Sequence, residues 1–140
     1  MPDESQIEDY WPDLDAAAVV TPASILKAQA AALSRKSKGL LQAEVETFGQ
    51  GGSVYHRLVI VVPALENYRY SLLSLHHPPT LYPVYVDEEP KLPGGVAYSL
   101  IPIEGRQLAD QDQFRAWLRS ALARDETKHV LESLMAQAAA

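Results

Sequence analysis

The hydrophobic period of the chain changes twice, and this change restricts the fold more than any other feature. Apolar residues recur at helical spacing in residues 22–37 and then follow the patterns of strands up to residue 103. From Leu108 onwards the spacing is helical again. A block of strands between terminal helices predicts an α+β fold: an N-terminal helix, a mainly antiparallel meander sheet and two C-terminal helices.

The first helix has the clearest boundaries. Thr21 is a favourable N-cap, Pro22 suits the first helical position, and Gly39 is typical of the residue that follows a helix. The residues between them are rich in Ala, the strongest helix former. The sequence therefore predicts a helix over residues 22–37.

Five strands are predicted, with four as the alternative. The glycine-rich stretch 49–52 lacks the Lys of a phosphate-binding loop and does not lead into a helical pattern, so we interpret it as a hairpin turn. Pro83 has no N–H to donate, which predicts an edge strand or a bulge there. The predicted strands span residues 40–48, 54–62, 68–76, 81–87 and 96–103.

The C-terminal third contains two apolar stripes that do not share a helical phase. Continuing the first stripe would bury Asp125 and His129, so a single long helix is disfavoured. The pattern predicts two helices, the first starting near Leu108, with a break within residues 124–127. Asp125 is the predicted N-cap of the second, with Glu126 in its first turn.

The negative charge is concentrated at the start of the chain. The net charge is −6, and residues 1–15 contain six acidic residues and no Lys or Arg. This predicts an acidic, aromatic segment over residues 1–20 and a single domain over residues 21–140. Tyr10 and Trp11 lie among the acids, a pattern that suits a basic-rimmed apolar groove on a partner. The alternative is that both rings fold back onto their own domain.

Composition excludes several classes of protein. Without cysteine, disulfide scaffolds, zinc–cysteine sites and iron–sulfur clusters are excluded. No stretch approaches the roughly 20 apolar residues of a membrane helix, and the first residues are acidic rather than signal-like, so we expect a cytoplasmic protein that does not bind membranes. The bases are scattered apart from Arg35, Lys36 and Lys38, so we expect no nucleic-acid partner.

Three histidines lie near one end of a predicted hairpin. A turn centred on Glu66 places His56 opposite His76. A two-residue turn at Glu66 and Asn67 places Arg57, rather than His56, opposite His76. In the first register His56 and His76, with His77 beside them, could form a two-histidine metal clip that lacks a third ligand. No nucleophile motif and no buried carboxylate pair accompanies them, so we expect no catalytic residue and no cofactor.

Tyrosine is abundant, with seven residues that lie mostly in predicted strands. Tyr, Trp and Arg are enriched in the energetically important parts of protein interfaces, although sheets also use Tyr for ordinary packing. The candidate partner-binding residues are Tyr10, Trp11, Tyr68, Arg69, Tyr70, Tyr82 and Tyr85.

These features favour a non-enzymatic protein–protein interaction module. The size, the acidic segment and the helix–meander–helix order resemble those of small bacterial accessory proteins, such as immunity proteins, inhibitors such as antitoxins, and secretion chaperones. This is a likeness of class, and no motif identifies one family. The alternatives are a small-ligand or metal-dependent enzyme with a site near His56, His76 and His77, and a structural protein that buries its second sheet face in a homodimer.

Overall fold

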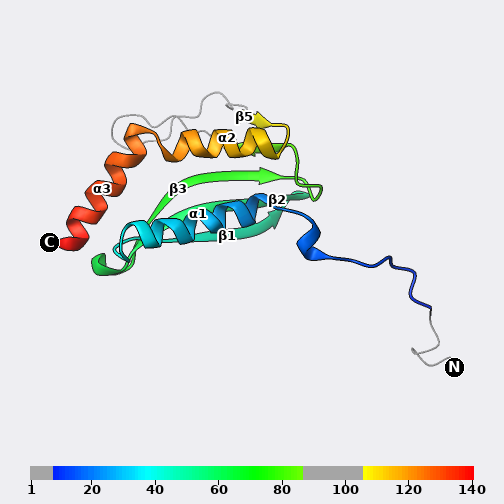
Figure 1. Ribbon diagram of the computed structural model, residues 1–140, viewed down its shortest axis with the longest axis horizontal. Coiled ribbons are helices and arrows are strands. Elements are labelled where there is room, and N and C mark those ends of the chain that lie inside the picture. Colours follow the sequence, from blue (N-terminus) through cyan, green and yellow to red (C-terminus); the bar gives the residue numbers. More distant parts are fainter. Residues whose placement is uncertain (1–7, 87–105) are drawn as a thin grey trace.

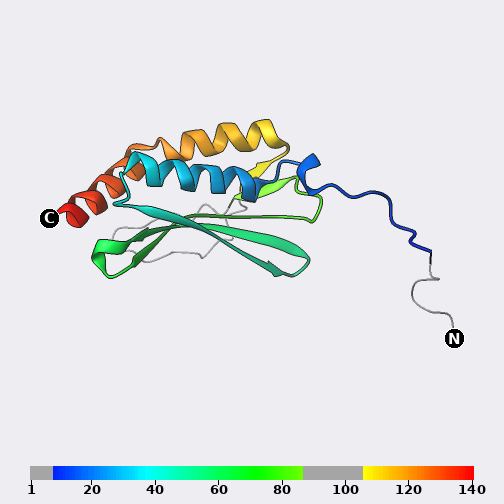
Figure 2. The ribbon, with the colours of Figure 1, turned by 60° about the horizontal axis from the view of Figure 1, so that its bottom comes forward.

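The computed structural model describes residues 8–86 and 106–140. It has an N-terminal helix, a five-stranded antiparallel sheet and two C-terminal helices, which confirms the predicted α+β fold. The described helices lie together on one face of the sheet (Figures 1 and 2).

The strands follow one another in space as they do in the sequence, in the order β1-β2-β3-β4-β5. The strands are β1 (Gln42–Gln50), β2 (Ser53–Val62), β3 (Tyr68–His77), β4 (Val84–Val86) and β5 (Arg106–Leu108). The helices are α1 (Pro22–Lys36), α2 (Gln111–Leu122) and α3 (Asp125–Ala139), with short 3-10 helices η2 (Ala16–Ala18) and η3 (Pro63–Leu65).

Helix α1 is bounded by local hydrogen bonds, which is why its sequence predicts it well. Thr21 Oγ1 accepts from the N–H of Ser24 at 3.0 Å, and the N–H of Thr21 donates to Ser24 Oγ at 3.1 Å. This reciprocal capping box satisfies two backbone donors at the start of the helix. After the helix, Gly39 has φ +81° and its N–H donates to the carbonyl of Ser34 at 2.9 Å. The predicted N-cap is confirmed.

The long strands β1, β2 and β3 form two successive hairpins. The glycine-rich turn between β1 and β2 places Gly51 and Gly52 at positive φ, and the predicted hairpin is confirmed. Between β2 and β3, η3 is followed by Glu66 and Asn67, both in the left-handed region. A register shift also occurs within this pair, between Leu58 and Val59.

The short strands differ from the predicted ones. Strand β4 lies between β3 and β5, so the predicted edge position is wrong. Pro83 precedes β4 and therefore removes no hydrogen bond from the ladder. Leu108, predicted to start a helix, lies in β5 and is buried. The predicted strand 96–103 lies outside the described residues.

The core lies between the sheet and the helices and has two parts. Near β4 and β5, Leu26 of α1 and Phe114 of α2 pack with Leu75, and none of the three is exposed. At the other end, Leu134 of α3 packs with Ile60 and other strand residues. Burial of such side chains contributes roughly 1.5–3 kcal/mol each and holds the helix layer on the sheet.

Helices α2 and α3 are separate, as predicted. Helix α2 ends at Leu122 and α3 begins at Asp125, so the break lies where the two apolar stripes change phase. Arg124, not Asp125, occupies the N-cap position of α3, so that detail of the prediction is wrong. Asp125 and Glu126 both lie in the first turn, where a carboxylate is favoured by the helix dipole.

Candidate functional site

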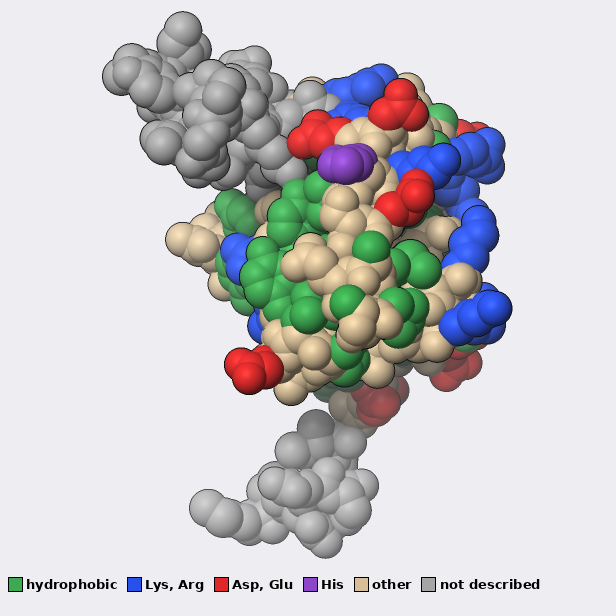
Figure 3. Space-filling view, turned by 90° about the vertical axis from the view of Figure 1, so that its left-hand side faces the viewer, with side chains coloured by type: hydrophobic (Ala, Val, Ile, Leu, Met, Phe, Trp, Pro, Cys, Tyr) green, Lys and Arg blue, Asp and Glu red, His purple; other side chains and the backbone are tan. Residues whose placement is uncertain are grey.

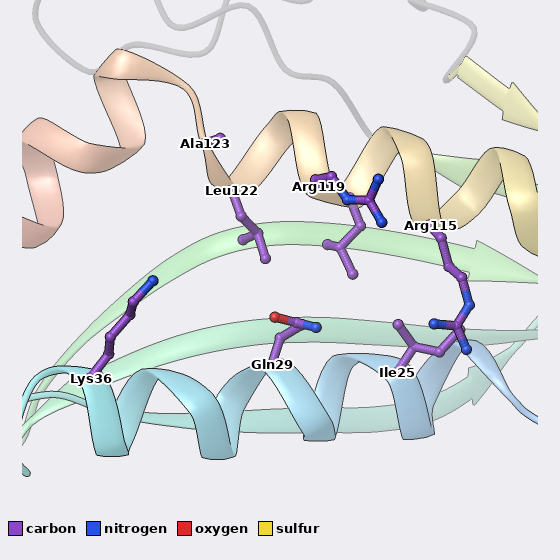
Figure 4. Close-up of a pocket in the computed structure, with 8 residues that line it drawn as sticks. Ile25, Gln29, Lys36, Arg115, Arg119, Leu122 and Ala123 are labelled. Atoms are coloured by element: carbon purple, nitrogen blue, oxygen red, sulfur yellow. The ribbon is translucent and has the colours of Figure 1, made fainter.

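A groove separates α1 from α2 on the helix side of the molecule (Figure 4). Its volume is about 390 Å³, within the range of pockets that bind ligands. Three apolar side chains contribute to its wall, Ile25 from α1 and Leu118 and Leu122 from α2. The complete lining is Ile25, Gln29, Lys36, Arg115, Leu118, Arg119, Leu122 and Ala123.

The charged residues of the groove are all cationic. Lys36 extends from α1, and Arg115 and Arg119, one turn apart, extend from α2 (Figure 4). Within residues 8–86 and 106–140, none of the three forms an ion pair. The side-chain amide of Gln111 is oriented so that its oxygen accepts a hydrogen bond from Arg115 Nε at 3.1 Å. This bond orients the guanidinium of Arg115 but leaves its positive charge uncompensated.

Further cations lie on the helix side of the molecule. In a space-filling view from the side, Lys and Arg side chains lie along the right-hand edge, with some Asp and Glu side chains among them (Figure 3). Charges of one sign beside a concave surface raise the local concentration of opposite charges. The groove therefore suits a ligand that carries both carboxylates and apolar groups.

The acidic, aromatic segment extends away from the domain (Figure 1). The exposed fractions are 85% for Tyr10, 78% for Trp11 and 79% for Leu14, so the alternative in which the rings fold back is wrong. Short turns shape the segment: Asp9 Oδ1 accepts from the N–H of Trp11, and Asp15 Oδ1 accepts from the N–H of Ala17, both at 2.9 Å.

The partner-binding residues predicted in the strands do not form one surface. Tyr70 packs against the core beneath α3, and Tyr82 packs against the core beneath α2. Burial raises the pKa of the Tyr82 hydroxyl, so this group stays neutral. Tyr68 is opposite the buried Val62 and is 49% exposed. Arg69 and Tyr85 lie on the opposite face of the sheet, which we call the far face.

On the far face, a row of stacked rings crosses four strands. Phe48 stacks on Tyr55, Tyr55 on His76, and His76 on Tyr85, with ring centroids 5.2, 4.8 and 5.2 Å apart. Cross-strand aromatic pairs stabilise a sheet by roughly 0.2–1 kcal/mol each. Of the predicted residues, Tyr85 and His76 thus belong to a structural row.

Arg69 is engaged in ion pairs on the same far face. Its guanidinium nitrogens lie 2.9 Å from Glu44 Oε2 and 2.5 Å from Glu46 Oε1. These hydrogen bonds raise the pKa of Arg69. Arg57 also lies 3.5 Å from Glu46, so this cluster compensates its own charge. It therefore differs from the groove, whose cations form no ion pair with any described residue.

The histidines are divided between the two faces. His56 lies opposite Leu75 and His76 lies opposite Tyr55, so both predicted registers are wrong. Glu66 and Asn67 are in the left-handed region, and the register shifts between Leu58 and Val59. Together these features change which residues of β2 and β3 lie opposite each other, so that His76 points to the far face. His56 instead meets His77, with 2.8 Å between their Nε2 atoms, on the helix face.

Hydrogen bonds define the protonation of the buried His56–His77 pair. The carbonyl of Pro78 can only accept, so His77 Nδ1, 2.8 Å away, carries a proton. His56 Nε2 lies 2.8 Å from His77 Nε2, and His56 Nδ1 forms a hydrogen bond with the Thr47 hydroxyl at 2.9 Å. Burial, and next the charge of His77, lower the pKa of His56 to about 4. The ring of His56 is therefore neutral near pH 7.

The described residues contain no group of three or more His, Asp or Glu placed to hold a metal ion. His56 and His77 form a pair, and their ring nitrogens are used by the hydrogen bonds to each other, Thr47 and Pro78. The pair thus closes the core beside β3 as a satisfied polar contact.

Sequence reasoning missed the groove, although a signal was present. Arg115 and Arg119 recur at i and i+4 beside the buried stripe of α2, so they share one flank of that helix. Their closeness to Lys36 depends on how α1 and α2 lie on the sheet, which no local pattern shows.

No family model, curated protein or solved structure matches the chain. Among the described residues, no helix is both long and apolar enough to cross a membrane. The fold and the groove thus define the described part of the chain as an α+β domain whose helices lie on one face of the sheet and border a cationic, partly apolar groove.

Proposed function

We propose that this protein is a non-enzymatic interaction module that binds an acidic, apolar segment of a protein in the groove between α1 and α2. The observation that carries this proposal is the set of three cations, Lys36, Arg115 and Arg119, which border an apolar surface and have no ion-pair partner among the described residues.

The dimensions of the groove suit a short peptide. From Ile25 to Lys36 the axis of α1 rises roughly 16 Å, which an extended peptide covers with about five residues. A carboxylate of such a peptide can accept two parallel N–H bonds from the guanidinium of Arg115 or Arg119. Its apolar side chains would cover Ile25 and Leu122.

A peptide-binding module of this size suits an accessory role in a bacterial cytoplasm, as an immunity protein, an inhibitor or a secretion chaperone. Such roles require a stable surface for one partner and no catalytic group. The histidine pair supports this reading, because its ring nitrogens are occupied by internal hydrogen bonds.

Selection from a random 12-residue peptide library displayed on phage tests the proposal. We expect enrichment of peptides that combine Asp or Glu with aromatic residues or Leu. The double variant Arg115→Glu/Arg119→Glu should lose these peptides, because it replaces attraction by repulsion. The matched control Lys27→Glu/Lys128→Glu changes the net charge equally at exposed positions outside the groove and should retain them.

Two results would contradict the proposal. One is enrichment of peptides without acidic residues. The other is binding that survives the Arg115→Glu/Arg119→Glu substitutions in a protein whose circular dichroism spectrum and unfolding midpoint match those of the parent.

A further inference from the structure

We infer that the groove binds residues 8–15 of a second copy of this chain, so that two chains exchange these segments and form a closed homodimer. This inference rests on the proposed function, because it names the acidic, apolar segment that the groove binds.

The chemistry of residues 8–15 is complementary to that of the groove. The segment contains four carboxylates and no Lys or Arg, whereas the charged residues of the groove are all cationic. Tyr10, Trp11 and Leu14 are each more than three-quarters exposed, although large apolar side chains favour burial. The groove offers Ile25 and Leu122 to such side chains. One contact would thus compensate both the charges and the exposed apolar area.

The direction of the segment favours a second copy over the groove of the same chain. The segment leaves the start of α1 and extends away from the body of the domain (Figures 1 and 2). Its direction is held by η2, in which Asp15 accepts from the N–H groups of Ala17 and Ala18. Docking onto its own groove would require the chain to reverse within residues 16–20 and lose these bonds. A second copy can receive the segment in the form observed.

Exchange between two copies gives a closed dimer whose interface buries enough area to be stable. Each chain contributes one segment and one groove, so a two-fold axis satisfies both and leaves neither exposed. An aromatic side chain buries about 150–250 Å², and two exchanged segments each contribute Tyr10 and Trp11. Counting both sides of each contact, the buried area reaches about 1,200–2,000 Å², which is the range of stable interfaces.

Sedimentation equilibrium with two complementary variants of the full chain tests the inference. The segment variant Tyr10→Ala/Trp11→Ala keeps its groove, and the groove variant Arg115→Glu/Arg119→Glu keeps its segment. We expect the parent chain to dimerise and each variant to raise the dimer dissociation constant at least about tenfold. Mixing the two variants should give a heterodimer tighter than either variant's homodimer but weaker than the parent dimer, because one of its two contacts joins an intact segment to an intact groove. Lys27→Glu/Lys128→Glu serves as the charge-matched control.

Quenching of tryptophan fluorescence by acrylamide provides an independent measurement. Trp117 is 5% exposed, so quenching reports mainly on Trp11. In the inferred dimer, Trp11 should become protected as the concentration of the parent chain rises. Protection that is independent of concentration in a monomer would show that the segment binds its own domain, which would overturn the inference.

Further results would also overturn it: a parent chain that stays monomeric, a dimer unaffected by either double variant, or variants that do not complement each other. The proposed function can be distinguished from the inference. If peptides selected from the library bind the groove of a monomeric parent chain in a manner that depends on Arg115 and Arg119, the exchange fails and the proposed function stands. If neither those peptides nor a second copy binds, both fail.

Discussion

At the scale of single residues, His56 is an ionisable side chain held without charge in the core. Its ring is 4% exposed, and its two nitrogens contact Thr47 and His77. Protonation would place a charge among Leu58, Leu75 and their neighbours, where little water can solvate it. This environment couples the stability of the fold to pH.

We expect the free energy of unfolding to fall as the pH decreases from about 6.5 to about 4. The pKa of His56 is lowered from 6.5 to about 4 in the folded state, so in this window the unfolded chain binds the proton that the folded chain excludes. The loss attributable to His56 reaches about 3 kcal/mol at the lower end. Above pH 6.5 the residue contributes no pH dependence.

Urea unfolding at several pH values, compared between the parent chain and His56→Gln, measures this effect. Glutamine keeps a donor and an acceptor but does not titrate, and the carboxylates titrate in both proteins, so the difference between the two curves isolates His56. Parallel curves between pH 6.5 and 4 would contradict the lowered pKa.

A second effect of a single residue is expected at the start of α1. Thr21→Ala removes the hydroxyl that accepts from the N–H of Ser24, and we expect a loss of about 1 kcal/mol in unfolding free energy. Thr21→Ser retains the acceptor and should retain most of the stability. Urea unfolding checks both, and equal midpoints for the Ala and Ser variants would show that the cap contributes nothing.

At the scale of elements, the helix layer is anchored to the sheet by a few fully buried side chains. Leu26 from α1 and Phe114 from α2 are 0% exposed and belong to one core cluster. The two helices meet through this cluster and the sheet, and both contribute side chains to the groove between them (Figure 4). Their anchors should therefore control the geometry of the groove.

We expect Leu26→Ala to destabilise the domain by about 2–5 kcal/mol and Phe114→Ala by about 3–5 kcal/mol. Both substitutions remove buried volume that the surrounding strands cannot refill. Val19→Ala, at a position 57% exposed and outside residues 8–15, is the control and should change the unfolding free energy by less than about 0.5 kcal/mol. Denaturant unfolding measures all three. Similar losses at Val19 and Leu26 would contradict the assignment of the core.

At the scale of the whole molecule, charge is separated between two parts of the chain. The excess of acidic residues lies before residue 16, and the groove between α1 and α2 contains three cations that form no ion pair with any described residue. Ion pairs on the far face, such as Arg69 with Glu44 and Glu46, neutralise the opposite side of the sheet. The molecule therefore presents one cationic surface and one anionic segment to its surroundings.

Binding in the groove should weaken as salt is added. The Debye length is about 10 Å at 0.1 M salt and about 3 Å at 1 M, so high salt screens the attraction between carboxylates and the exposed Arg115 and Arg119. Titration of a selected peptide at increasing sodium chloride should give a steadily higher dissociation constant. The unfolding free energy, dominated by the apolar core, should change much less. An affinity independent of salt would contradict the electrostatic part of the proposal.

Local signals determined the elements whose causes are local. Thr21, Pro22 and Gly39 bound α1 because a cap and a positive φ act within one turn, and the glycines at 51 and 52 determine the first hairpin in the same way. The change of apolar phase separates α2 from α3. Strand β5, by contrast, has three residues and exists through pairing with β4, so its own pattern could not reveal it.

The sequence by itself determined the α+β class, the cap of α1 and the acidic, aromatic composition of the first segment, because each depends on neighbours in the chain or on composition. Tertiary structure decided which histidines meet, since a register shift of one residue moves a side chain to the other face of the sheet. It also decided that Lys36 joins Arg115 and Arg119. Their charges come from residues far apart in the sequence, and only the packing of two helices on one sheet brings them to a single groove.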